Sequence, residues 1–398
     1  MIKNSFILLC LIISSSFASN LEQIVNSAIN NNRDLQAIEK SIQIANEQIK
    51  LSNKWDNPIL TIGANDLQFD TSRRDLEPMQ AQYLGFSQNI PINDKFTLQE
   101  EIAIKDKSIA QLNYEDAKLK LKSKLIQYVY SIKILEKKYL LLSEYQKNIK
   151  ALEELTTSLY ENNKSNQNMI IDLKTDYLKV EVQKEELKNI INNNYLKLEE
   201  ITYEKVSSID IPLDVKELVL VKEISNHPKI KILEQNSEKF NKQALLEDAK
   251  KFSDVKVNVA YFQRDDKYKD YANVSVSIPL ALYGKENIKI MQAKIKASEF
   301  KDKLEDSKKS FELKIEALQN DLNSAYKKYQ LFLNTIIPLQ ENNQNTIEKY
   351  NSLGITQPNE ILKNLNKIIK NKIAAYDEMK SYFDTYAQSY YFTQGKIR

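Results

Sequence analysis

The chain alternates between long segments with a 3.5-residue hydrophobic period and short segments with a two-residue period. In the long segments the apolar residues step by four and three, which is typical of helices that pack in coiled coils. The first such seam is Leu121, Leu125, Tyr128, Ile132, Leu135, Tyr139 and Leu142, and the second is Phe311, Ile315, Leu318, Leu322, Ala325, Tyr329, Phe332, Ile336 and Leu339.

Each seam is followed by a polar turn, after which the period resumes. The turns span Glu161 to Asn168 and Asn351 to Pro358. The chain is therefore predicted to contain two helical hairpins, at about 95–205 and about 285–395. A single arm of such a hairpin would extend on the order of 100 Å at 1.5 Å per residue, which is the length of a rod and not of a compact domain.

Two pairs of strands interrupt the helices. Strands are predicted at about 57–70 and 80–91 and, with a clearer alternation of apolar and polar residues, at about 254–263 and 271–280. A polar loop separates the strands of each pair, and the second strand of each pair ends on Ile-Pro before a long helix. Period two flanked by turn residues indicates strands with one apolar and one polar face.

The order of these elements indicates an internal duplication. An opening helix is predicted before each strand pair, over Leu21 to Asn53 and over Val215 to Lys251. The first repeat then covers 19–205 and the second covers 206–398. The predicted fold class is mainly α with β, built from duplicated helical hairpins and four strands.

Composition excludes several functions. The 398 residues include only 5 Gly and 8 Pro, too few for the tight turns and ligand loops of a compact α/β enzyme. The 57 basic and 54 acidic residues are interspersed, so no nucleic-acid partner is predicted. The single histidine, His227, has no set of further metal ligands and is interpreted as a helix start before Pro228. We find no catalytic or cofactor motif and predict no enzyme, no cofactor and no metal site.

Residues 1–18 have the features of a secretory signal peptide. Lys3 gives the positive start, Phe6 to Ile13 the apolar stretch, and Ser16-Phe17-Ala18 the cleavage site. Cys10 is the only cysteine of the chain and would be removed with this segment; the alternative is that Cys10 is a lipidation site. Disulfides are therefore excluded from the mature chain.

Four strands cannot close a barrel, because single-chain transmembrane barrels have at least eight. Three associated copies would give twelve strands without an open edge. In this interpretation one face meets lipid, and the alternative is a soluble β-layer packed on helices. The predicted lipid-facing residues are Val255, Val257, Val259, Val274, Val276 and Ile278; Asn258, Asn273, Ser275 and Ser277 would line a wet lumen. Candidates for interfacial aromatic belts are Trp55, Tyr83, Phe86, Tyr261, Phe262, Tyr271 and Tyr283.

Short motifs in the same order along the chain carry a resemblance to a known family. The chain resembles the TolC-like outer-membrane factors, or outer membrane efflux proteins, of Gram-negative efflux and type I secretion systems. The motifs are Asn32-Arg33-Asp34-Leu35 and its repeat Asn226-His227-Pro228-Lys229-Ile230, Asn57-Pro58-Ile59-Leu60, Gly85-Phe86-Ser87-Gln88-Asn89-Ile90-Pro91, Ile337-Pro338 and Tyr350-Asn351-Ser352-Leu353-Gly354.

The resemblance implies a homotrimer with a 12-stranded transmembrane β-barrel in the outer membrane and an α-helical tunnel in the periplasm. It also implies a periplasmic adaptor (membrane fusion) protein and an inner-membrane pump of the RND or ABC type as partners. The expected function is a passive exit duct of a tripartite efflux pump. Modest length and short loops favour small-molecule or metal efflux. The alternatives are a type I protein secretion duct and a non-channel periplasmic coiled-coil protein.

The resemblance further assigns roles to residues near the two turns. The turns themselves are expected to contact the adaptor, through Asn162, Asn163, Lys164 and Ser165 in the first and Leu353, Gly354, Ile355 and Thr356 in the second. The first turn lacks the family's glycine, with Asn163 or Lys164 in its place. Glu360 and Lys363 are the expected aperture, or gate, residues. A lysine at position 363, where the family often has an acid, argues against a purely acidic ring.

Overall fold

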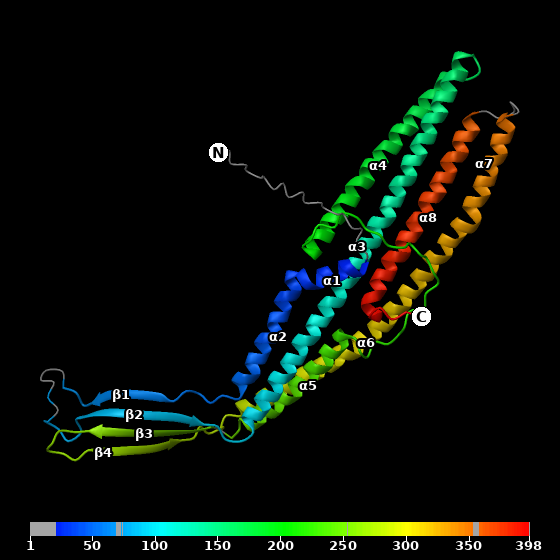
Figure 1. Cartoon of the computed structure of the whole chain (residues 1–398). Helices are drawn as coiled ribbons and strands as arrows, with labels where there is room; N and C mark the ends of the chain where they lie inside the picture. Colours follow the sequence, from blue (N-terminus) through cyan, green and yellow to red (C-terminus); the bar gives the residue numbers. More distant parts are fainter. Residues whose placement is uncertain (1–20, 69–72, 74, 253, 353–357, 398) are drawn as a thin grey trace, which may run out of the picture. The chain divides into compact units, whose positions relative to one another are not determined.

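The computed structural model describes residues 21–68, 73, 75–252, 254–352 and 358–397, and it is mostly helical (Figure 1). The predicted signal peptide lies outside these residues. The elements are α1 (Leu21–Asn31), α2 (Arg33–Ser52), β1 (Ile59–Asn65), β2 (Ala81–Ile90), α3 (Lys95–Glu161), α4 (Gln167–Thr202), α5 (Pro228–Ala249), β3 (Val255–Gln263), β4 (Tyr271–Ser277), α6 (Lys285–Leu331), the π-helical turn η1 (Phe332–Ile336), α7 (Ile337–Ser352) and α8 (Pro358–Thr393).

The chain divides into two compact units. We call the first the hairpin unit; its described residues are 21–36, 117–224 and those between 310 and 397. The second, the sheet unit, contains the described residues of 37–116 and 225–309. Both units combine segments from the two predicted repeats, because equivalent elements of the repeats pack together.

The hairpin unit is held together by the predicted coiled-coil seams. Leu125 and Ile132 of α3 are fully buried, as is Ile315 of α6. Leu173 of α4 and Leu362 of α8 belong to one further apolar cluster. The hydrophobic period thus identified many of the buried positions, because in a coiled coil the residues at this spacing share one helix face. Leu339, the last member of the second predicted seam, is an exception, since it is 62% exposed.

The sheet unit contains one antiparallel sheet in the order β1-β2-β3-β4 (Figure 1). All four strands were predicted, each within a few residues of its observed bounds. β2 pairs with β3 although they are far apart in sequence, so the two repeats contribute half of the sheet each. Two strand pairs of the kind predicted therefore join into one continuous sheet.

The opening helices differ from the prediction. The first is broken at Asn32, whose side-chain oxygen accepts a hydrogen bond from the Leu35 amide at 3.0 Å and so caps α2. The second, predicted from Val215, begins only at Pro228, because His227 Nδ1 accepts from the Lys229 amide at 3.1 Å. The interpretation of His227 as the helix start is thus confirmed.

The segment before α5 is irregular where a helix was predicted. Its backbone groups are bonded by side chains from the surrounding helices: the Leu220 amide donates to Gln319 Oε1 at 2.7 Å, and the Lys216 carbonyl accepts from the Tyr382 hydroxyl at 2.7 Å. The apolar residues of this segment pack between helices and do not form a helix face of their own. Their spacing alone does not distinguish these two situations.

A second difference is the π-helical turn η1 between α6 and α7, where an uninterrupted helix was predicted. Pro338 follows it by two residues. Proline has no amide hydrogen, and its ring clashes with the carbonyl four residues earlier. That carbonyl belongs to Asn334, inside η1, and the wider π turn relieves the clash.

The first hairpin turn is closed by an asparagine in a left-handed conformation. Asn163 has φ 57°, and its amide donates to the Tyr160 carbonyl at 2.9 Å. Asn166 then caps α4 by accepting from the Met169 amide. Asparagine suits this position, because it tolerates the left-handed backbone region better than other residues with a Cβ.

The core of the hairpin unit contains several buried tyrosines. Burial raises the pKa of Tyr130, Tyr386 and Tyr390, and raises the pKa of Tyr382 to about 12. In the unfolded chain these groups would ionise at about pH 10. Above that pH the folded state keeps protons that the unfolded state loses. The contribution of these tyrosines to the free energy of unfolding is therefore fully present only below about pH 10.

We expect the free energy of unfolding to fall as the pH rises above about 10. The substitution Tyr382→Phe should reduce this alkaline loss, because it removes one group whose pKa differs between the two states. Denaturant unfolding of both proteins at about pH 8 and about pH 11, followed by helical circular dichroism, measures the effect. An identical pH dependence in the two proteins would contradict this assignment.

Substitution of Asn163 tests the turn. Asn163→Val should destabilise the folded protein by about 1–2 kcal/mol, because a β-branched residue is strained at positive φ. Asn163→Gly should be neutral or slightly stabilising, since glycine adopts this conformation without strain. The comparison of the two unfolding midpoints is the measurement; equal midpoints would mean that this φ value does not constrain the turn.

Candidate functional surfaces

The sheet has one continuous apolar face. Val257 pairs with Val276 and Val259 with Val274, so the predicted lipid-facing residues of β3 and β4 share a face with Val255. Ile278 follows the end of β4 and is also exposed. The same face continues across the other strands, where Leu60, Ile62, Leu84, Phe86 and Tyr261 are exposed in matching register.

The side chains of the apolar face are highly exposed to solvent. The exposed fraction reaches 75% for Ile62 and 71% for Val274, although both side chains are wholly hydrocarbon. Among the described residues, none of the apolar clusters that join the helices includes a residue of this face. An exposed apolar surface of this kind marks contact with another protein or with a membrane.

The opposite face is polar. The Asn258 side chain donates to Ser275 Oγ at 3.3 Å across two strands, and Asn273 and Ser277 lie on the same face. All four residues were predicted to face away from the lipid, and the register agrees with that arrangement.

One cross-strand row on the polar face is aromatic. Tyr83 stacks on Phe262 and Phe262 on Tyr271, with ring centroids 5.1 Å and 4.7 Å apart. The row ends on Gly63, where a Cβ atom would lie 2.6 Å from the Tyr83 ring. These three rings were predicted as part of a belt at the lipid surface, and that prediction is wrong: their register places them on the face opposite the valines. The other four candidates, Trp55, Phe86, Tyr261 and Tyr283, are exposed.

Both edges of the sheet are open within the described residues. β1 pairs only with β2, and β4 only with β3. Because neighbouring strands alternate in direction, β4 runs opposite to β1. The two edges could therefore pair with each other as antiparallel neighbours if they belonged to different copies.

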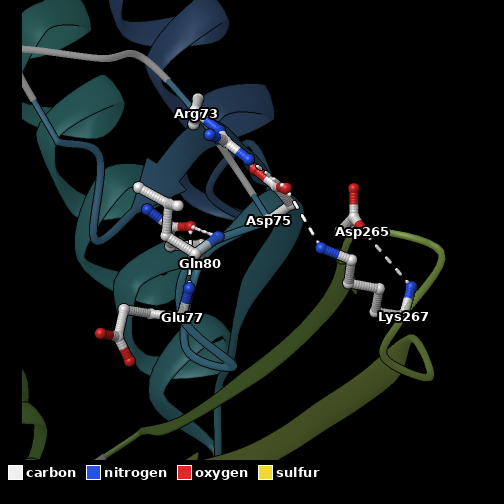
Figure 2. Close-up of polar contacts among 7 residues, drawn as sticks. Arg73, Asp75, Glu77, Gln80, Asp265 and Lys267 are labelled. Atoms are coloured by element: carbon white, nitrogen blue, oxygen red, sulfur yellow. Dashed lines mark hydrogen bonds and ion pairs between the residues drawn. The ribbon is translucent and has the colours of Figure 1, made fainter.

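The loops at one end of the sheet are fastened to each other by polar contacts (Figure 2). Arg73 donates two hydrogen bonds to Asp75, and Lys267 Nζ lies 3.2 Å from Asp75 Oδ2. Arg73 and Lys267 together hold the pKa of the Asp75 carboxyl well below its usual range. Gln80 supports the first loop by accepting from the amides of Leu76 and Glu77. Each exposed ion pair contributes little energy, so the contacts mainly define the loop conformation.

The residues expected at the hairpin turns are only partly described. Asn162, Asn163 and Lys164 are exposed at the end of the α3–α4 hairpin, and Ser165 is half-buried. The residues expected in the second turn, Leu353, Gly354, Ile355 and Thr356, lie outside the described residues.

The two expected gate residues line one groove in the hairpin unit. Glu360 and Lys363 lie on the first turns of α8, both exposed, beside a groove of about 940 Å³ between α4 and α8. In the described part of the chain no ion pair joins these two residues, so the intrahelical pair that their spacing allows is not formed.

The groove contains further polar residues that the sequence analysis missed. The Asn366 amide donates to Asp176 Oδ2 at 3.2 Å and so joins α8 to α4. Tyr145 lies beside them, and burial, followed by the nearby Asp176 carboxylate, raises the pKa of its hydroxyl. Four lysines also line the groove, namely Lys179, Lys363, Lys367 and Lys370. The last three lysines are separated by four and three residues and so lie on one face of α8, which could have been recognised in the sequence.

A buried polar network lies between α7 and α8. Asn364 is only 3% exposed, and its side chain accepts from Asn343 and donates to Gln344 Oε1 at 2.8 Å. The hydrophobic period gave no indication of this network, because Asn364 falls between apolar seam residues. Polar residues inside a coiled-coil seam fix the register of the two helices.

Among the described residues, no helix combines the length and the apolarity that crossing a membrane requires. The same residues contain no group of three or more His, Cys, Asp or Glu side chains arranged to hold a metal ion.

Comparisons with known proteins give one family match over part of the chain and one fold over nearly all of it. Residues 24–202 match the family model described as outer membrane efflux protein. None of the curated proteins matches the sequence. Among solved structures the chain is similar to the CmeC outer membrane channel of Campylobacter jejuni, with 14% identity, a TM-score of 0.76, and coverage of 94% of this chain and 85% of that one.

Two further structures have the same fold. VceC, an outer membrane protein of Vibrio cholerae, has 12% identity and a TM-score of 0.77, with coverage of 94% of this chain and 96% of that one. The open state of the MtrE outer membrane channel of Neisseria gonorrhoeae has 14% identity and a TM-score of 0.74, with 94% and 89% covered.

The matched family and structures are channel proteins of outer membranes and not enzymes, in agreement with the sequence analysis. The mainly helical fold with a small sheet is confirmed. Residues 24–202 thus match the outer membrane efflux protein family model, and the chain has the fold of these outer membrane channels over 94% of its length.

Proposed function

We propose that this protein is the passive outer-membrane exit duct of a tripartite efflux pump. The observation that carries the proposal is the sheet, which combines one exposed apolar face, one polar face and two open edges. A bilayer would cover the apolar face, and a wet lumen would solvate the polar face. Pairing with other copies would satisfy the backbone groups of the two edges.

Three copies fit these requirements better than two. Two copies would give eight strands, and the interior of an eight-stranded barrel is filled by side chains. Twelve strands leave an aqueous lumen, which suits the asparagine, serine and tyrosine side chains of the polar face. An even number of alternating strands in each copy also lets β4 of one copy meet β1 of the next in antiparallel fashion.

A duct of this kind supplies no energy itself. The sequence has no nucleotide-binding motif, so the driving force must come from an inner-membrane pump of the RND or ABC type through a periplasmic adaptor. We assign the adaptor contact to the exposed turn at Asn162–Ser165 and to Leu353–Thr356. Small molecules or metal ions are the favoured cargo, because the chain is of modest length and the loop from β3 to β4 is short; a secreted protein is the alternative.

We place the gate at the groove beside α8. Glu360 and Lys363 are exposed there and close to other charges, so movement of α8 relative to α4 would change the electrostatic field along the path. The Asn366–Asp176 hydrogen bond resists this movement in the present conformation.

The alternative function is a periplasmic coiled-coil protein that forms no channel. The apolar face argues against it, because such a protein would leave a continuous hydrocarbon surface in water. Fractionation separates the two: a duct stays in outer membranes after a carbonate wash, whereas a scaffold is released.

Charge on the apolar face should prevent insertion. Val274→Lys should be depleted from carbonate-washed outer membranes, because a lysine on the lipid side of a barrel costs about 2–4 kcal/mol near the bilayer midplane. Asn273→Lys is the matched control, since the adjacent residue points to the polar face and should be retained. Equal retention of both variants would contradict a membrane-spanning sheet.

Charge reversal at the gate should alter conduction. Glu360→Lys should change the single-channel conductance in a planar bilayer and reduce the preference for cations, with Glu360→Gln intermediate. Glu154→Lys, an exposed position on α3 that does not line the groove, is the control for added charge. Unchanged conductance and cation preference in Glu360→Lys would remove this residue from the gate.

A further inference from the structure

The groove between α4 and α8 contains a buried hydroxyl group that nothing bonds. Tyr145 of α3 lines this groove and is only 4% exposed, yet its hydroxyl oxygen has no hydrogen-bond partner among the described residues. Buried polar groups are almost always bonded, so an unbonded one calls for an explanation. Burial raises the pKa of this hydroxyl, and the Asp176 carboxylate raises it further, so the group keeps its proton and is able to donate.

The nearby carboxylate of Asp176 is already engaged. Its Oδ2 atom accepts from the Asn366 amide at 3.2 Å, and its Oδ1 atom accepts from Lys179 at 3.2 Å. The Tyr145 hydroxyl is therefore the donor that the groove offers to something outside the described residues.

Two lysines of α8 bring further donors to the groove. Lys367 and Lys370 line it and are exposed, and no ion pair joins either ammonium group to another described residue. By contrast, Lys372 and Lys380 of the same helix are paired with carboxylates. Lysines on an open surface are commonly solvated, but here they share a groove with an unbonded buried hydroxyl. This combination indicates a site for an anion.

The charges of the groove are separated along its length. α4 and α8 both start at a hairpin turn, and the hydrogen bond between them joins residues 190 positions apart. At this offset Asp172 and Glu360 lie toward the turns. Lys179, Lys367 and Lys370 lie further from them. The end of the groove away from the turns is therefore the positive end.

Tyr145 belongs to the same end. Gln146, the next residue of α3, donates to Glu181 of α4. Glu181 is two residues beyond Lys179 in the direction away from the turns. The unbonded hydroxyl and the unpaired lysines thus lie at similar heights.

The walls at this end are apolar. Val180 of α4 and Ile369 and Ile373 of α8 line the groove beside the lysines. The groove volume is about 940 Å³, which is in the range of pockets that hold small organic molecules. A bare inorganic ion would leave most of this space and its hydrocarbon walls unused. The ligand that fits has a hydrocarbon body and an anionic group.

We propose that this end of the groove binds amphipathic organic anions, with Lys367, Lys370 and the Tyr145 hydroxyl donating to the anionic group. Val180 and Ile369 cover the hydrocarbon body. An aromatic or aliphatic sulfonate or carboxylate has this chemistry. The inference rests on the proposed function, within which it narrows the cargo from small molecules and metal ions to organic anions. A metal cation would meet lysines of like charge at this end.

Calorimetric titration of the protein in lipid nanodiscs tests the ligand class. The probe is a naphthalene sulfonate, and nanodiscs without protein give the blank. Saturable binding is expected, and it should weaken at high ionic strength because salt screens the lysines. Inorganic sulfate has the charge without the body, and the neutral naphthalene sulfonamide has the body without the charge. Each should bind about tenfold more weakly or less. Equal affinity of either compound, or no binding of the sulfonate, would overturn the proposal.

Substitutions locate the binding in the groove. Tyr145→Phe removes only the hydroxyl and should weaken sulfonate binding about tenfold. Because this hydroxyl is unbonded in the free protein, the variant should be at least as stable as the parent. Lys367→Gln combined with Lys370→Gln should weaken binding about tenfold or more. Lys174→Gln is the matched control, since this exposed lysine of α4 does not line the groove and should leave binding unchanged. Parent-like affinity of Tyr145→Phe or of the double lysine variant would overturn the site.

Planar bilayers separate this proposal from the proposed function. The sulfonate should reduce the single-channel current of the parent, and the double lysine variant should need about tenfold more of it for the same reduction. A conducting channel that the sulfonate neither binds nor blocks would overturn the groove site while the duct stands. Binding to a protein that forms no channel would overturn the duct, and with it the cargo class, while the groove site stands.

Discussion

Unsatisfied backbone hydrogen bonds at the two sheet edges are the constraint on which the rest of the structure depends. β1 and β4 each present a row of amide and carbonyl groups without partners within the described residues. Water could solvate these groups, but the apolar face of the same strands favours hydrocarbon, where no water is available. A closed ring made from several copies is the arrangement that meets both demands at once.

The outermost helices beside the sheet also have surfaces without a partner in the described residues. The coiled-coil seams are largely satisfied within one chain, as the buried Leu125 and Ile315 demonstrate, while α2 and α6 keep exposed apolar residues such as Ile44 and Ile295. Buried polar residues such as Asn364 fix the alignment of two helices more than they strengthen their packing. A buried amide is costly unless it is hydrogen-bonded, and only one alignment of α7 and α8 provides its partners.

The candidate sites differ in how far the sequence could identify them. The alternation at Val255–Val259 predicted the apolar face correctly, because every second side chain of a strand points to the same face of the sheet. The aromatic residues were misassigned, since residue type alone does not report which face Tyr83 or Phe262 occupies. The bond that Asp176 of α4 makes in the groove beside Glu360 and Lys363 was missed, because α4 is distant from α8 in sequence.

The amino-acid sequence by itself indicated the long helices, the strands and the helix cap at His227, because heptad spacing, alternation and caps act between residues close in the chain. It did not exclude a helix from Val215 onward, where none is formed before Pro228. Only the tertiary structure decided that both strand pairs form one sheet, that the segment before α5 is not helical and that η1 interrupts the long helix. These features depend on which partners saturate the backbone groups. Those partners, such as Gln319 for the Leu220 amide, come from distant parts of the chain that local patterns do not specify.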